Sequence, residues 1–362
     1  MITVGFIGLG LIGGSIARAF KNKCGKYRTI AYNRSHEPLD TAVAEKIIDE
    51  GTYEVDSTFA QCDIIFLCTP VEHNSTYLAK LKDIISDNCI ITDVGSVKGY
   101  IHNTVKELHM EKCFIGGHPM AGSEKTGYAA STDTLLENAY FAITPTSESS
   151  QASIDMYKGL VTDTGAIPVI VDPYIHDFAV AGISHVPHLI ASSLVNLVAD
   201  NDTPDELMRM LAAGGFKDIT RIASSSADMW SQICVTNEAA ISKLLAKYIE
   251  SLRRIKEYVD NKDRDAIADM FVRSKEYRDS INLREKGLIL ENNSLLVNIV
   301  DKEGSLNEIT SILSDNKISI KNIEIIHNRE YRDGVLMIDF YDKTASELAN
   351  NILNDNGYTI TK

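Results

Sequence analysis

The residues of this chain best suited to acid–base chemistry lie in the stretch Gly116-Gly-His-Pro-Met-Ala-Gly-Ser-Glu124. The apolar run Cys113-Phe-Ile115 precedes it and predicts a short buried strand, after which Gly116 and Gly117 let the backbone turn. A histidine at the carboxyl edge of a sheet titrates near neutrality, which suits proton transfer. We therefore predict His118 as an acid–base residue, with a histidine that only caps a turn as the competing interpretation.

Two further polar residues follow a predicted strand over 89–93, in the turn that leads into the next helix. We expect Ser96 and Lys98 to expose a hydroxyl and an ammonium at the same edge of the sheet as Thr69. Ser96 could serve a site or cap the helix, and the two roles are compatible.

A second group of candidates lies beyond residue 171, where strand patterns give way to helical ones. His185 and His188 share one face of a long apolar helix over 175–199 that is kinked or restarted at Pro187. The pair has no third ligand at a suitable spacing, so packed histidines are expected and no metal site. Arg221 follows a pair of glycines and offers a fork of donors to a carboxylate, unless it forms an ordinary surface ion pair.

The start of the chain predicts a nucleotide site. Strand formers over 2–7 lead into a glycine loop over 8–13 and then into a helical pattern. Gly8 permits the tight turn, Gly10 lets a pyrophosphate approach the backbone, and Gly13 lets helix and strand pack closely. The helix N-terminus adds free N–H donors for phosphate.

The second predicted strand, over 29–32, ends in Asn33-Arg34-Ser35 and not in the acidic residue that would accept from both ribose hydroxyls. A guanidinium and a hydroxyl suit a 2′-phosphate, so NADP is favoured over NAD unless Arg34 is a solvated surface charge. The residues assigned to the cofactor are Gly8, Gly10, Leu11, Ile12, Gly13, Asn33, Arg34, Ser35, Thr69 and Pro70.

Alternating strand and helix patterns predict an α/β, Rossmann-type, doubly wound sheet over residues 1–170. Residues 171–287 read as an all-α domain whose apolar faces are expected to pack against a second copy of the chain. Capping boxes are expected to open helices at Thr203/Glu206 and Thr344/Glu347. A linker over 286–293 then leads into a βαββαβ pattern over 294–362, typical of a small α+β ferredoxin-like domain.

The composition limits the partners. A net charge of −14 and a pI near 5.1 argue against nucleic acid or an anionic membrane, so an acidic substrate must meet local cations. We expect no apolar run near the ~20 residues that span a bilayer and, because a strand pattern begins at residue 2, no signal peptide. The six cysteines lack regular spacing and are expected to be reduced thiols of a cytoplasmic protein.

Five motifs together resemble the prephenate dehydrogenase family, which includes arogenate dehydrogenases, and the last 70 residues resemble an ACT domain. The motifs are Gly8 to Ser15, Asp93-Val-Gly-Ser-Val-Lys98, Gly117-His-Pro-Met-Ala-Gly-Ser-Glu124, Ser184-His-Val-Pro-His188 and Gly214-Gly-Phe-Lys-Asp-Ile-Thr-Arg221. The resemblance implies oxidative decarboxylation of prephenate to 4-hydroxyphenylpyruvate in tyrosine biosynthesis, by a homodimer with NAD or NADP and no metal.

The same resemblance implies roles for the candidate residues. His118 would accept the proton of the ring hydroxyl, and Ser96 would orient the histidine or that hydroxyl. Arg221 would clamp a substrate carboxylate. The remaining substrate-site candidates are His188 and His185 at the other polar end, Glu124 and Asp218 at the pocket entrance, and Trp230 near the pocket.

Two departures from the family pattern keep alternatives open. The absence of an acid after the second strand puts NAD in doubt and leaves arogenate as an alternative substrate. The loop with Gly304, Ser305 and Asn307 resembles the ligand loop of ACT domains, although Glu303 stands where a proline is frequent. Feedback by tyrosine is therefore a hypothesis.

Two other classes compete with this assignment. A β-hydroxyacid or 6-phosphogluconate-type dehydrogenase would need a catalytic lysine in the helical domain, for which Lys217 and Lys243 are candidates. A non-enzymatic sensor would only bind nucleotide and amino acid.

Overall fold

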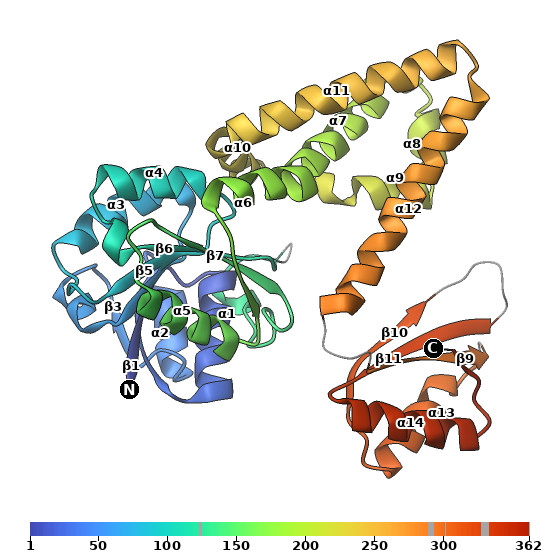
Figure 1. Cartoon of the computed structure of the whole chain (residues 1–362). Helices are drawn as coiled ribbons and strands as arrows, with labels where there is room; N and C mark the ends of the chain where they lie inside the picture. The colour runs from blue at the N-terminus through green and yellow to red at the C-terminus, as the bar shows by residue number, and fades with distance from the viewer. Residues whose placement is uncertain (123–124, 289–292, 301, 327–332, 362) are drawn as a thin grey trace. The chain divides into compact units, whose positions relative to one another are not determined.

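The computed structural model describes residues 1–122, 125–288, 293–300, 302–326 and 333–361. Glu124, a predicted site residue, lies outside these ranges. The chain divides into two compact units, Met1–Leu252 and Arg253–Lys362, and each is described by itself (Figure 1).

The first unit begins with a five-stranded parallel sheet in the order β3-β2-β1-β4-β5. Its strands are β1 (Ile2–Ile7), β2 (Tyr27–Tyr32), β3 (Glu50–Thr52), β4 (Ile64–Leu67) and β5 (Ile90–Asp93). The helices between them are α1 (Leu11–Ala19), α2 (His36–Ala44), α3 (Val71–Lys82) and α4 (Gly99–Glu107).

Both faces of this sheet are buried, which explains the continuous apolar runs of its strands. In β4, Ile64 and Phe66 belong to one apolar cluster, while Ile65 and Leu67 belong to the other. The doubly wound Rossmann-type arrangement predicted for this part of the chain is confirmed.

A second, three-stranded sheet consists of β6 (Ile115–Pro119), β7 (Tyr140–Pro145) and β8 (Ile167–Ile170), with α5 (Gln151–Asp163) connecting β7 to β8. A single parallel bridge between Ile91 and Phe114 links it to β5. β7 runs antiparallel to β6 and parallel to β8, so the predicted strands do not continue one uniformly parallel sheet.

The predicted turn at Gly116 and Gly117 is wrong, because both residues lie inside β6. A Cβ on Gly116 would collide with the Thr144 hydroxyl, and one on Gly117 would collide with the Tyr157 hydroxyl. These glycines are therefore needed for close packing around the strand and not for a change of chain direction.

The long apolar helix is continuous over Pro173–Asn201, as α6 (Pro173–Val180), a π-helical turn over 181–185 and α7 (Val186–Asn201). The Val186 N–H donates to the Ala181 carbonyl five residues back, and Pro187, which has no N–H, falls in the first turn of α7. The helix is long and apolar enough to cross a membrane by length and composition, as core helices of soluble proteins also can be. The expectation of no such run is therefore wrong.

The rest of the first unit is helical, with α8 (Leu207–Leu211), α9 (Gly214–Thr220), α10 (Ala227–Thr236) and α11 (Glu238–Asp260), which crosses into the second unit. The capping box at Thr203 and Glu206 is wrong, because Glu206 has a left-handed backbone and α8 begins after it. The Asp202 carboxylate accepts the N–H groups of Met208 and Arg209, and the Thr203 hydroxyl accepts that of Leu207.

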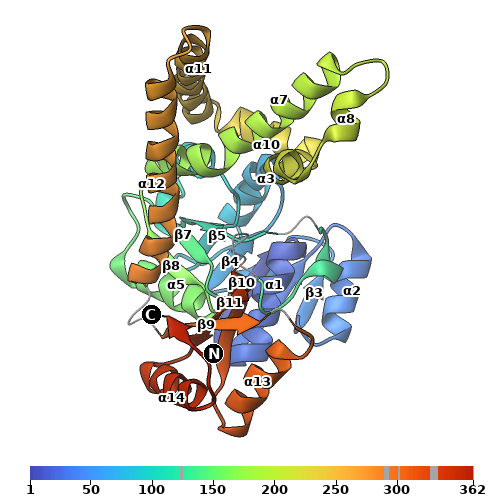
Figure 2. The ribbon, with the colours of Figure 1, turned by 90° about the vertical axis from the view of Figure 1, so that its right-hand side faces the viewer.

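The second unit contains α12 (Arg264–Leu288), which extends into the predicted linker, and an antiparallel sheet in the order β10-β11-β9-β12. Its other elements are β9 (Ser294–Val300), α13 (Ser305–Asp315), β10 (Ile320–Ile326), β11 (Asp333–Phe340), α14 (Lys343–Asp355) and β12 (Ile360–Thr361). Helices α13 and α14 lie on one side of this sheet (Figure 2). The ferredoxin-like fold is confirmed, but Asp342 caps α14 by accepting the Ala345 N–H at 2.8 Å, in place of the predicted Thr344.

Candidate active site

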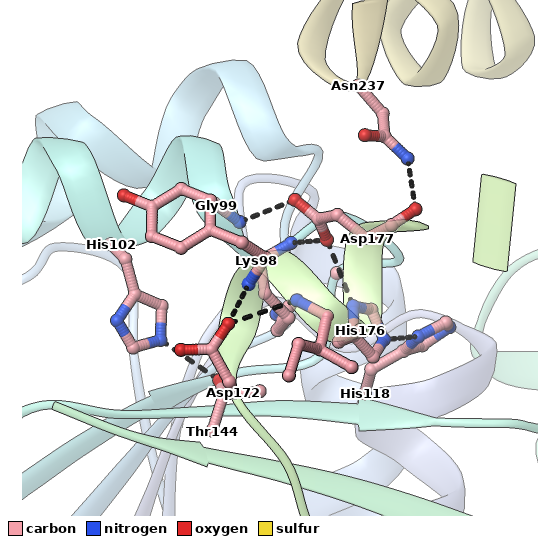
Figure 3. Close-up of polar contacts among 12 residues, drawn as sticks. Lys98, Gly99, His102, His118, Thr144, Asp172, His176, Asp177 and Asn237 are labelled. Carbon is pink, nitrogen blue, oxygen red and sulfur yellow. Dashed lines mark hydrogen bonds and ion pairs between the residues drawn. The ribbon is translucent and has the colours of Figure 1, made fainter. Parts of the chain in front are cut away.

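His118 contacts a second histidine from another element of the fold. Its Nδ1 lies 2.8 Å from Nε2 of His176, and Nδ1 of His176 lies 2.9 Å from Oδ1 of Asp177 (Figure 3). His118 belongs to β6, whereas His176 and Asp177 belong to α6, so the contact joins the second sheet to the helical region. His176 is only 3% exposed, which makes this a buried hydrogen-bond chain.

Asp177 also holds the N-terminus of α4. Its Oδ1 accepts the N–H of Lys98 and its Oδ2 accepts the N–H of Gly99, both at 2.7 Å (Figure 3). The first N–H groups of a helix have no partner within the helix, and α4 has no side-chain cap of its own. Ser96 therefore does not cap α4, and that interpretation is wrong; the half-buried side chain lies in the turn before the helix.

A buried ion pair fixes the backbone beside His118. Lys98 pairs with Asp93, and the two side chains are 0% and 1% exposed, so the expected exposed ammonium is wrong. Nζ of Lys98 also donates to the Gly117 carbonyl at 2.7 Å, and Oδ1 of Asp93 accepts the Gly117 N–H at 3.3 Å. The pair thus holds the residue before His118 from both sides of its backbone.

The surroundings of His118 keep its ring neutral, and the predicted titration near neutrality is wrong. Burial lowers the pKa of His118 well below its usual value, and the neighbouring His176, Lys98 and His185 lower it further. A neutral imidazole has one nitrogen without a proton, so His118 can accept a proton at neutral pH.

The predicted substrate-site residues His185, His188 and Trp230 lie together in the helical region. The rings of His188 and Trp230 stack with centroids 3.7 Å apart, and His185 meets the same indole edge-on at 5.9 Å. Asn237 donates to the Asp177 carbonyl at 2.9 Å and lies 3.1 Å from Nδ1 of His185. Burial lowers the pKa of His185 to about 4, so this ring is also neutral.

Two predicted residues lie in an exposed segment that packs against α7. Asp218 lies in α9 and Arg221 in the short 3₁₀ turn that follows, and both side chains are exposed. Among the described residues, the His118 ring contacts His176.

The glycine loop has the backbone geometry that a dinucleotide requires. Gly8 has a φ of +99°, and a Cβ on Gly13 would lie 2.6 Å from the Gly8 carbonyl oxygen, so neither position accepts a side chain. A Cβ on Gly10 would meet no atom within 4 Å, which leaves the backbone there open to a ligand. Leu11 and Ile12 form the first turn of α1, whose N-terminal N–H groups point to the same place.

The residues after β2 have two different environments. Asn33 accepts the Leu9 N–H at 2.8 Å, so it supports the glycine loop. Arg34 and Ser35 are exposed. At the end of β4, the Thr69 hydroxyl donates to Asn74, and Pro70 precedes α3.

Four residues around the site, Asp93, His176, Asp177 and Asn237, have no role predicted from the sequence, although Asp93 opens one of the family motifs. His176-Asp177 was readable as a polar pair in the first turns of an otherwise apolar helix. Its role depends on contacts with residues at least 58 positions away, which no local pattern reports.

Comparison with known proteins covers most of the chain. Residues 16–170 match the family domain described as "Prephenate dehydrogenase, nucleotide-binding domain", and residues 172–273 match "Prephenate dehydrogenase, dimerization domain". The chain is 38% identical over 340 residues to the prephenate dehydrogenase of Bacillus subtilis (strain 168), covering 93% of this chain and 92% of the relative. It is 34% identical over 349 residues to that of Lactococcus lactis subsp. cremoris (strain MG1363), covering 94% of each.

A solved structure agrees with this assignment. The structure of the prephenate dehydrogenase from A. aeolicus in complex with hydroxyphenyl propionate and NAD+ superposes with a TM-score of 0.73 at 32% identity. The match covers 78% of this chain and 98% of that one. With its glycine loop, its neutral half-buried histidine and these matches, the chain belongs to the prephenate dehydrogenase family.

Proposed function

We propose that this protein oxidises and decarboxylates prephenate with a nicotinamide nucleotide, giving 4-hydroxyphenylpyruvate for tyrosine biosynthesis. The observation that carries the proposal is a neutral, half-buried His118 held by the His176 contact in the same unit as a glycine loop shaped for a dinucleotide. Membership of the family supplies the substrate class.

Gly8, Gly10, Gly13 and the N-terminus of α1 would hold the nucleotide, which would supply the hydride acceptor for the ring carbon that carries the hydroxyl. His118 takes the hydroxyl proton as the C–H electron pair leaves, and the O–H pair forms the carbonyl. The bond to the ring carboxylate then breaks, its electron pair enters the ring, and carbon dioxide departs. The phenolate oxygen recovers the proton from His118, so the residue returns to its neutral form.

The remaining candidates bind and orient the substrate. Arg221 offers a bidentate clamp to one carboxylate, which an acidic protein needs if it is to bind a dianion. His188 and His185, arranged around Trp230, serve the other polar end of the substrate. Ser96 orients His118 or the reacting hydroxyl. Asp218 and Glu124 control entry to the pocket.

For the nucleotide, we propose a preference for NADP. Arg34 is an exposed guanidinium after β2, at the position where a 2′-phosphate would be met. Asn33, whose side chain is already bonded to the glycine loop, adds no charge that would repel a phosphate.

Arogenate is the second candidate substrate. The arogenate dehydrogenase of Synechocystis superposes with a TM-score of 0.71 at 29% identity, and the match covers 77% of this chain and 100% of that one. Initial rates with prephenate and with arogenate, each measured with NAD and with NADP, test the substrate preference and the nucleotide preference together. Reduction of the nucleotide with 6-phosphogluconate, and with neither of the other two substrates, would instead favour the β-hydroxyacid class. Of the two lysines that could be catalytic in that class, Lys217 is exposed and Lys243 lies 5.5 Å from the centre of the Phe178 ring.

Regulation and assembly complete the proposal. The helix Pro173–Asn201 exposes Ile175, Ile183 and Leu197 by 60% or more, and we infer that a second copy of the chain covers this face in a cytoplasmic homodimer. We infer that tyrosine binds at Gly304, which has a φ of +91° before α13, with Ser305 and Asn307 beside it. A tyrosine titration that leaves both the activity and the melting temperature unchanged would remove this regulatory role.

A further inference from the structure

We propose that His176 and Asp177 are positioning residues that fix the tautomer of His118, so that its Nε2 is the nitrogen that accepts the substrate proton. The proposal rests on the proposed function for the identity of the reaction. The tautomer itself is a property of this chain and can be tested without a substrate.

The direction of each hydrogen bond follows from the chain of contacts. The Asp177 carboxylate can only accept, so the nitrogen 2.9 Å from it, Nδ1 of His176, must carry a proton. In a neutral His176 this leaves Nε2 as an acceptor. Nδ1 of His118, at 2.8 Å, must then donate to it.

This assignment leaves Nε2 of His118 as its only basic position. A neutral imidazole carries one ring proton, and that proton is committed to the His176 contact. The reverse orientation would require a doubly protonated His176 that donates to Nδ1 of His118. It would place a second cation in the region that holds Lys98, and the described counter-charge of His176, Asp177, already accepts two helix N–H groups.

The contacts of Asp177 hold the His118–His176–Asp177 hydrogen bonds in a fixed geometry. Its two oxygens accept the N–H groups of Lys98 and Gly99 at the start of α4, and its own carbonyl accepts from Asn237. Asp177 is 6% exposed and cannot rotate without leaving two helix N–H groups unbonded. The same contacts become stronger when His118 gains a proton, because its Nδ1–H then donates as part of a cation.

Nitrogen-15 NMR of the full chain labelled in its nine histidines tests the tautomer directly. The signals of His118 are assigned by their loss in His118→Asn. At neutral pH we expect a protonated Nδ1 and an unprotonated Nε2 in the wild type. A dominant Nε2–H form would overturn the proposal, whether or not the protein turns over prephenate.

Steady-state kinetics test whether the tautomer matters for turnover. His176→Leu removes the acceptor and should lower kcat on the order of thirtyfold, the loss expected for one hydrogen bond to a developing cation. His176→Gln keeps an acceptor near the Nε2 position and should recover most of that loss. Equal losses in both variants would contradict the proposal.

A double-mutant cycle separates positioning from a general loss of structure. Because His176 acts through His118, His176→Leu should change turnover less than about twofold in the His118→Asn background. A thirtyfold loss in both backgrounds would overturn the proposal. Failure of the proposed function has a different signature, namely a wild-type protein that oxidises neither prephenate nor arogenate.

Discussion

The two ends of the proposed reaction centre are built in different ways. Around His118, the described polar side chains Lys98, Asp93, His176 and Asp177 are buried, and the contact with His176 joins β6 to α6. At the nucleotide end, the residue expected to discriminate between cofactors, Arg34, is an exposed side chain after a strand. If the proposed function holds, proton transfer would depend on preorganised geometry, while cofactor choice would depend on a surface charge.

The largest effect should come from breaking the buried ion pair. Lys98→Met leaves the Asp93 carboxylate buried without its cation and removes a donor to the Gly117 carbonyl. The free energy of unfolding should fall by about 3–5 kcal/mol, as measured by urea denaturation. Lys80→Met, at an exposed position of α3, is the control and should stay within about 0.5 kcal/mol of the wild type.

His118→Asn should abolish most of the turnover without unfolding the protein. Loss of the general base should lower kcat by about a hundredfold or more, while nucleotide affinity stays unchanged because the glycine loop is intact. Rates and nucleotide titrations measure the two quantities. The exposed His109→Asn serves as a matched control, and a His118→Asn variant with wild-type turnover would refute the base assignment.

Arg221→Gln should affect binding more than chemistry. Removal of a bidentate donor to a carboxylate should raise KM on the order of tenfold with a smaller change in kcat. Arg209→Gln, which removes a guanidinium from an exposed ion pair in the neighbouring helix, is the control. An unchanged KM in Arg221→Gln would exclude the clamp.

The pH dependence of stability should reveal the buried histidines. His185 has a folded pKa of about 4 against 6.5 in the unfolded chain, so between these values the unfolded state binds a proton that the folded state does not. Stability contributed by the neutral ring is therefore complete above pH 6.5 and lost as the pH falls toward 4. His185→Gln should reduce the slope of unfolding free energy against pH by up to about 1.4 kcal/mol per unit in this window. An unchanged slope would contradict the neutral assignment.

The same contrast explains what could be predicted from the sequence. The β1–loop–α1 unit and His118 are recognisable because short-range patterns and motifs specify them. Lys98 was expected to be exposed because an ammonium in a turn is usually solvated, yet Asp93, five residues earlier, compensates its burial. The partnership of His118 with His176 arises only when α6 packs on β6, so the sequence alone could not reveal it.

The smallest expected effect lies at the exposed end. Arg34→Ala should lower kcat/KM with NADP several-fold and leave kcat/KM with NAD nearly unchanged, because a solvent-screened contact to a 2′-phosphate contributes about 1 kcal/mol. Lys80→Ala is the matched control for the loss of one surface charge. Equal losses with both nucleotides would assign Arg34 to the support of the loop instead of to cofactor choice. An effect as large as that of His118→Asn would mean that the nucleotide end is as preorganised as the acid–base end, and the distinction between the two would fail.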